Sequence, residues 1–143
     1  MKRIINGKAY DTTTARLVGE WYNGRGVTDF DYCEEKLYCK RTGEYFIHGV
    51  GGAMSRYAKA AGQSSWTGGE RIMPVSYEQA QAWAESNLDA DTYENEFGVV
   101  DESAGDADLH VVISAAAYDR IRRTAAQDGT TVRAVIERLA ATL

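Results

Sequence analysis

Residues 108–143 read DLHVVISAAAYDRIRRTAAQDGTTVRAVIERLAATL and carry the most specific pattern of the chain. Large aliphatic side chains occupy every second position of the first segment, as on a half-buried strand: Leu109, Val111 and Ile113. Ser114 then supplies an N-cap for a first helix, which Gly129 ends. Thr130 or Thr131 caps a second helix. The pattern therefore predicts one strand followed by two helices.

These three predicted elements share an apolar face. The second helix repeats its apolar residues at helical spacing, and the first helix adds one more. A segment of 36 residues is too small to bury a core alone. The sequence therefore predicts a dimerisation face made of Leu109, Val111, Ile113, Ile121, Val132, Val135, Ile136 and Leu139.

The order strand, Ser, helix, Gly, Thr, helix resembles the ribbon-helix-helix family, the fold of the Arc and MetJ repressors. The resemblance covers 36 of 143 residues. It implies a homodimer in which two strands pair antiparallel and the helices interlock. It also implies that the paired strands enter the major groove of DNA, while the amino end of the second helix holds a phosphate.

Carried over by position, the resemblance implies a set of DNA-contacting residues: His110, Val112, Ser114, Arg120, Arg123, Thr130 and Thr131. The chain departs from the family where bases are read. Asp108 repels phosphate, and Val112 offers only a methyl contact. Two roles for this domain therefore stay open, a reader of promoter DNA and a clamp that only joins two copies.

The first 97 residues predict a small α+β domain with a three-stranded antiparallel sheet. Strand patterns fall at 2–5, 36–40, 44–49 and 71–75, and helix patterns at 12–21, 53–61, 77–87 and 89–97. Ser76 and Gln79 have the capping-box spacing before one of the helices. Residues 98–107 are polar, small and acidic, which is typical of a flexible linker. The predicted domains are therefore 1–97 and 108–143, joined by 98–107.

Composition excludes several protein classes. The chain holds 16 Lys and Arg against 21 Asp and Glu, and its net charge of −5 argues against non-specific nucleic-acid binding by the whole molecule. No apolar run approaches the ~20 residues that span a bilayer, and the start resembles no signal peptide. We therefore expect a cytoplasmic protein with no membrane partner, in which Cys33 and Cys39 stay reduced.

Acidic charge is concentrated in one part of the chain. Between Arg71 and Arg120 lie 48 residues without a Lys or Arg. Such a run forms either a solvated face or a negative field that attracts a basic groove. The predicted partner-binding surface combines its helical carboxylates with one aromatic residue from a polar loop: Glu78, Glu85, Asp89, Asp91, Glu94, Glu96 and Trp66.

The amino-terminal domain resembles a family of small proteins encoded on bacterial prophages and other mobile elements. The resemblance rests on KRIINGK at 2–8, on TGxYFxHGxGGAxSxY at 42–57, where x is any residue, and on AW at 82–83. It implies an accessory or anti-defence role, including anti-CRISPR activity. The implied partner is a Cas protein or a CRISPR surveillance complex, which holds nucleic acid in a basic channel.

The leading hypothesis is a non-enzymatic, dimeric anti-CRISPR protein that mimics nucleic acid. One alternative is a ribbon-helix-helix transcriptional regulator or antitoxin. Another is an anti-defence protein that sequesters a nucleotide at 49–52 (GVGG), before a predicted helix. The spacing Cys33-x5-Cys39-x8-His48 does not fit a structural zinc site, and no nucleophile adjoins His48, so no metal, cofactor or catalytic residue is predicted.

Overall fold

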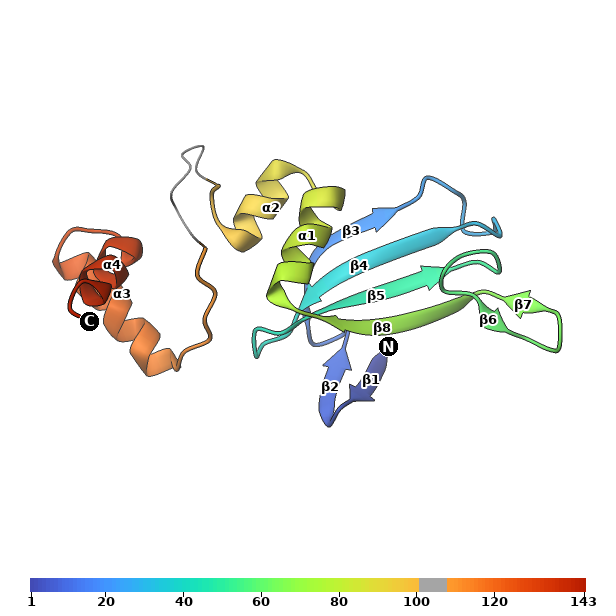
Figure 1. Cartoon of the computed structure of the whole chain (residues 1–143), viewed down its shortest axis with the longest axis horizontal. Helices are drawn as coiled ribbons and strands as arrows, with labels where there is room; N and C mark the ends of the chain where they lie inside the picture. Colours follow the sequence, from blue (N-terminus) through green and yellow to red (C-terminus); the bar gives the residue numbers. More distant parts are fainter. Residues whose placement is uncertain (101–107) are drawn as a thin grey trace. The chain divides into compact units, whose positions relative to one another are not determined.

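The structure is a computed structural model that describes residues 1–100 and 108–143 (Figure 1). The chain divides into two compact units, Met1–Asp108 and Leu109–Leu143, here called the N-unit and the C-unit. This division falls close to the predicted start of the second domain. Most of the predicted linker, residues 101–107, lies outside the described residues, and so do three carboxylates of the acidic run.

The described part of the N-unit contains eight strands and two helices: β1 (Lys2–Ile5), β2 (Lys8–Asp11), β3 (Arg16–Tyr22), β4 (Cys33–Cys39), β5 (Tyr45–Gly51), β6 (Lys59–Ala60), β7 (Trp66–Thr67), β8 (Gly69–Val75), α1 (Tyr77–Asn87) and α2 (Ala90–Phe97). The main sheet is antiparallel, with the order β3-β4-β5-β8, and β1–β2 and β6–β7 form two smaller sheets. The α+β class is therefore confirmed, but the main sheet has four strands where three were predicted.

The strand of the main sheet that was not predicted is β3. It occupies most of the segment predicted as a helix at 12–21. Asp11 does not cap a helix. Its carboxylate accepts hydrogen bonds from the backbone N–H and hydroxyl of Thr13, at 2.9 and 2.7 Å, which closes a turn. The chain then pairs with β4 from Arg16 onward. Pairing with a strand about twenty residues away overrides the local helical spacing.

The helix predicted at 53–61 is also absent. This segment forms turns and then β6, which pairs with β7. Tyr57 is buried because its ring lies over Gly49 of β5, where a Cβ would come within 2.0 Å of the Tyr57 Cζ atom. Met54, expected on the same helical stripe, is 71% exposed. Contact with the sheet therefore decides the conformation of this segment.

One face of the main sheet packs against the two helices (Figure 1). Leu37 of β4, Tyr45 and Ile47 of β5 and Ala80 of α1 form the core there. The helices begin and end close to their predicted bounds, because their signals are local. Ser76 makes the predicted capping box with Gln79.

The β1–β2 hairpin covers one end of the opposite face of the sheet. Tyr10 of the β1–β2 hairpin packs on Phe46 and Ile72 of the sheet. The Tyr10 and Phe46 rings meet edge to face, with centroids 5.6 Å apart. Farther along the strands this face carries charged and aromatic side chains, which are described below.

The C-unit contains α3 (Ala115–Gln127) and α4 (Val132–Ala140), with N-caps at Ser114 and Thr131 as predicted. Residues 108–114 form no strand. The predicted strand has no pairing partner among the described residues of one chain, so the ribbon stays a prediction. None of the helices described in either unit is long and apolar enough to cross a membrane.

Candidate functional site

The acidic helix pair is the first candidate surface. We use this name for the carboxylates of α1 and α2 that face solvent: Glu78, Glu85 and Asp91, which are exposed, and Glu94, which is half-buried. Within the described parts of the chain, none of these four carboxylates forms an ion pair. Glu78 and Glu85 are seven residues apart and share one face of α1, about 10.5 Å from each other.

Glu96 does not belong to this surface, although the sequence placed it there. Its side chain is 8% exposed and accepts two hydrogen bonds from the Arg16 guanidinium, at 2.7 and 2.9 Å. The Tyr45 hydroxyl donates a third, at 2.6 Å. The hydrogen bond with Glu96 raises the pKa of Arg16, and burial, followed by the same carboxylate, raises the pKa of Tyr45. Glu96 therefore anchors α2 to the sheet.

Asp89 has a structural role as well. It is the N-cap of α2, and its carboxylate accepts a hydrogen bond from the backbone N–H of Thr92 at 2.7 Å. This backbone hydrogen bond lowers the pKa of Asp89. The side chain stays exposed and charged, so it adds to the field of the acidic helix pair while fixing the start of the helix.

Sequence reasoning missed a buried carboxylate, Glu35 of β4, which is 4% exposed. It accepts hydrogen bonds from the Trp83 indole N–H of α1, at 2.6 Å, and from the Tyr57 hydroxyl, and it pairs with Arg56. Burial raises the pKa of Tyr57, and the hydrogen bond with Glu35 adds to the shift. Both carboxylate oxygens have partners, which is typical of a structural group that joins α1 and the 52–57 turn to the sheet.

The second candidate surface is a groove at the end of the main sheet where β3 finishes and β4 starts. It consists of two adjoining hollows of about 330 and 540 Å³, which share Val27, Tyr32 and Glu34. We call it the aromatic groove. Four large side chains that line it are each more than 60% exposed: Tyr22, Val27, Phe30 and Trp66. Trp66 is therefore exposed rather than buried in a core, and it lines this groove instead of joining the carboxylates of α1 and α2.

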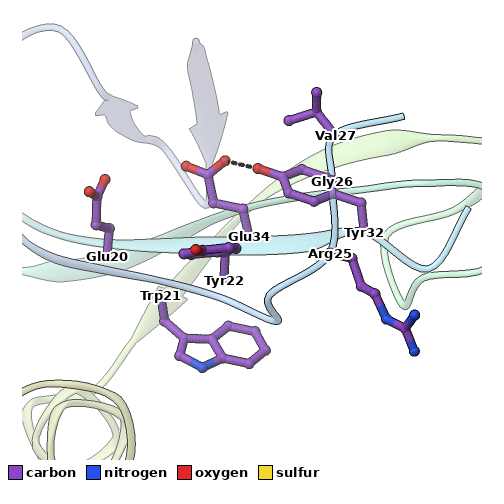
Figure 2. Close-up of a pocket in the computed structure, with 8 residues that line it drawn as sticks. All are labelled: Glu20, Trp21, Tyr22, Arg25, Gly26, Val27, Tyr32 and Glu34. Carbon is purple, nitrogen blue, oxygen red and sulfur yellow. Dashed lines mark hydrogen bonds between the residues drawn. The ribbon is translucent and has the colours of Figure 1, made fainter. Parts of the chain in front are cut away.

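Polar groups of Tyr32 and Glu34 meet in the lining of the smaller hollow (Figure 2). The Tyr32 hydroxyl donates to Glu34, and this bond raises the pKa of Tyr32 to about 12. The Lys36 ammonium lies 2.6 Å from Glu34 and 3.9 Å from Glu20. Its hydrogen bond lowers the pKa of Glu34, so this carboxylate is ionised at neutral pH. In Figure 2 the indole of Trp21 points to the opposite side of the strand from Glu20.

The glycines at 49–52 do not precede a helix, although the nucleotide-sequestration hypothesis expected one there. Gly49 and Gly51 belong to β5, and the segment directly after them forms turns and β6 instead of the predicted helix. A row of helical N–H groups is therefore absent at this position. His48 of the same strand pairs with Glu70 of β8 at 2.9 Å, and the pair lowers the pKa of Glu70.

The cysteines are free thiols: Cys33 is buried and Cys39 is half-buried. Burial raises the pKa of the Cys39 thiol. Within the residues that the structure describes, no cluster of three or more His, Cys, Asp or Glu side chains is arranged to hold a metal ion.

The third candidate surface is the apolar face of the C-unit. Val135 is buried between α3 and α4, and Ile121 and Val132 are half-buried. The other predicted dimerisation residues are exposed, by 37 to 72%: Leu109, Val111, Ile113, Ile136 and Leu139. A hollow of about 310 Å³ runs between the helices, lined in part by Ile121, Val135 and Leu139. One copy of this unit therefore leaves these five large apolar side chains exposed.

The residues implied for DNA contact are all exposed: His110, Val112, Ser114, Arg120, Arg123, Thr130 and Thr131. Two of them also hold the helix ends. The Ser114 and Thr131 hydroxyls accept backbone hydrogen bonds from Ala117 and Ala134, at 3.2 and 3.1 Å. Arg138 is paired with Asp128 at 2.8 Å, and so is less available to a phosphate.

We compared the chain with protein-family models, with curated proteins and with solved structures, and none of them matches it.

Proposed function

We propose that this chain is a non-catalytic anti-defence protein of the anti-CRISPR type. In this proposal the acidic helix pair enters the basic nucleic-acid channel of a Cas protein or surveillance complex in the bacterial cytoplasm. The C-unit joins two copies as a ribbon-helix-helix dimer.

The observation that carries this proposal is the exposure of Glu78, Glu85 and Asp91 on two helices that contain no Lys or Arg. Carboxylates that face water without a nearby cation produce a negative potential. A channel built for phosphates presents the opposite sign, so the two surfaces attract each other. Because Glu96 is paired with Arg16, the acidic surface carries one charge fewer than the sequence predicted. The same ion pair fixes α2 in place.

Dimerisation strengthens such an inhibitor. A few carboxylates replace only part of the charge of a duplex, which carries one charge per ~1.7 Å of its axis. Two copies held together bind a partner with two sites more tightly than one copy does, provided that both reach it. The uncovered apolar face of the C-unit supports this arrangement.

The test is binding of the full chain to a panel of purified Cas nucleases and surveillance complexes. For any complex that binds, we expect the double variant Glu78→Gln/Glu85→Gln to bind at least about tenfold more weakly. The control is Asp31→Asn/Asp119→Asn, which removes the same charge from exposed positions outside the acidic helix pair. Equal affinity of both double variants, or no binding to any complex, would contradict the proposal.

A second candidate function, a regulator that binds promoter DNA, is favoured by a different observation. Arg120, Arg122 and Arg123 of α3 are exposed, and none forms an ion pair within the described residues. A gel shift on the DNA upstream of the gene at several salt concentrations tests this candidate. Tight, sequence-specific binding that weakens steeply with salt and is reduced in Arg120→Gln/Arg123→Gln supports the regulator, and its absence rejects it.

A further inference from the structure

The aromatic groove has no part in the charge mimicry proposed above. Three of its lining residues, Glu20, Tyr22 and Glu34, lie on the opposite face of the main sheet from α1 and α2. Glu20 and Tyr22 are two residues apart on β3, so they point to the same side of the sheet. Glu34 lies opposite Tyr22 in the register of β3 and β4. The ring and the two carboxylates therefore line one hollow from neighbouring strands.

We propose that this hollow is a docking site for an arginine side chain of a partner protein. The exposure of the rings is the first support. Side chains such as Tyr22, Phe30 and Trp66, each more than 60% exposed around adjoining hollows, are typical of interaction sites. Tyrosine and tryptophan also dominate the contacts that contribute most to binding.

The charges of the lining residues indicate which kind of ligand the hollow would bind. The residues lining the two hollows include three carboxylates, Glu20, Asp29 and Glu34, and one cation, Arg25. Figure 2 shows the Arg25 guanidinium directed away from the Glu34 carboxylate. Lys36 holds Glu34 tightly at 2.6 Å but lies 3.9 Å from Glu20, whose side chain is 65% exposed. The ion pair of Glu20 is therefore longer than that of Glu34, and its exposed carboxylate can accept a second cation.

Arginine fits this combination best among the cationic side chains. Its flat guanidinium stacks on an aromatic face such as Tyr22, and it donates two parallel hydrogen bonds to a carboxylate such as Glu20. The ammonium of lysine does not stack in this way. A phosphate-bearing ligand is disfavoured, because the carboxylates that line the hollow repel it.

The test uses the full chain and one small probe, N-acetyl-arginine methylamide, titrated in an NMR experiment that follows the backbone amides. We expect saturable shifts at Tyr22 and Glu34, with a Kd of about 1 mM for a ligand of this size. The citrulline analogue has the same shape without the charge, and we expect it to bind at least about tenfold more weakly.

Matched variants locate the site. Glu20→Gln is expected to weaken binding at least about threefold, and Tyr22→Leu by a similar factor, because each removes one of the two contacts. Glu78→Gln removes the same charge from α1 and is expected to leave the Kd unchanged, which separates this inference from the proposed function.

Three results would overturn the inference: equal binding of the citrulline analogue, an unchanged Kd in Glu20→Gln, or the same shifts caused by adenosine monophosphate. Both variants lie at exposed positions, so loss of folding is not expected, and the unchanged amide spectrum far from the groove checks it. The measurement needs no Cas protein, so its outcome does not depend on the anti-CRISPR proposal.

Discussion

The two units of the chain differ in how far each completes its own core. In the N-unit, Leu37 and Phe46 are fully buried, one on each side of the main sheet. In the C-unit, the buried apolar side chains are Ala125 and Val135, while Leu109 and Leu139 are more than half exposed. The N-unit thus closes its core within one chain. The C-unit leaves apolar surface that only another surface can cover.

This difference suits the two units to different roles. A closed core holds side chains in fixed positions, as Glu35 and Glu96 do with partners from several elements. Such a unit can present a defined charged or aromatic surface to a partner. An open core drives association, because each copy gains by removing apolar area from water. We therefore expect the stability of the C-unit, and not that of the N-unit, to depend on protein concentration.

The largest expected effect is the loss of the dimer in Ile113→Asp. In the proposed ribbon this position faces the shared core, so the variant buries a carboxylate from each copy. We expect the dimer Kd to rise at least about a thousandfold, or ~4 kcal/mol, in sedimentation equilibrium. Val112→Asp, on the opposite side of the same strand, is the control and should still dimerise. If both variants dimerise normally, the prediction that two copies pair through a ribbon is wrong.

The next effect is confined to the N-unit. Leu37→Ala removes a fully buried side chain from the core between β4 and α1. We expect a loss of about 3 kcal/mol in the free energy of unfolding of this unit, measured in urea by tryptophan fluorescence. Because the core is closed within one chain, the loss should be the same at low and high protein concentration. A loss that changes with protein concentration would contradict the conclusion that the N-unit closes its core within one chain.

A third prediction separates two carboxylates that look alike in the sequence. Glu96→Gln removes the charge that Arg16 and Tyr45 hold, and we expect it to destabilise the N-unit by about 2 kcal/mol. Glu85→Gln, on exposed α1, should change stability by less than about 0.5 kcal/mol. Thermal unfolding of the two variants measures the difference. Equal melting temperatures of the two variants would show that Glu96 does not stabilise the contact between α2 and the sheet.

The smallest effect is a pH dependence in the N-unit. Hydrogen bonds from Lys40 and then Lys8 lower the pKa of Glu44 from 4.5 to about 2. A carboxylate with a lowered pKa stabilises the fold above its unfolded pKa, and this contribution is lost as pH falls from about 4.5 toward 2. Solvent screens the two ion pairs of Glu44, so we expect the free energy of unfolding to fall by less than about 1 kcal/mol.

Glu44→Gln provides the control for this pH dependence. In urea unfolding at pH 6 and pH 3, we expect the variant to lose less stability than the natural chain between the two pH values. An identical loss in both proteins would contradict the assigned role of Glu44.

The sequence predicts elements whose signals are local. The capping box of Ser76 and Gln79 and the caps at Ser114 and Thr131 all lie where the sequence placed them. Strand β3 was missed because its conformation is decided by pairing with β4, whereas its own residues also fit a helical spacing. The alternative was open to detection, since Val18, Trp21 and Tyr22 are residues that favour strands.

The candidate site was predicted less completely, for the same physical reason. Exposure of the carboxylates of α1 follows from their helical spacing, whereas the polar loop around Trp66 left burial and exposure of this side chain equally open. The partners of Glu35 and Glu96 lie up to 48 and 80 residues away, so no local pattern reveals them. The aromatic groove is lined by residues from segments that are far apart in the sequence, near positions 20–34, 50–53 and 66–68.

Sedimentation equilibrium of the full chain tests the central claim most directly, that the C-unit completes its core with a second copy. Across about 1 to 100 µM protein, we predict a mass of twice the 15.8 kDa of one chain, with dissociation only at the lowest concentrations. A mass of 15.8 kDa at every concentration, in a sample whose C-unit helices are formed by NMR, would contradict the account.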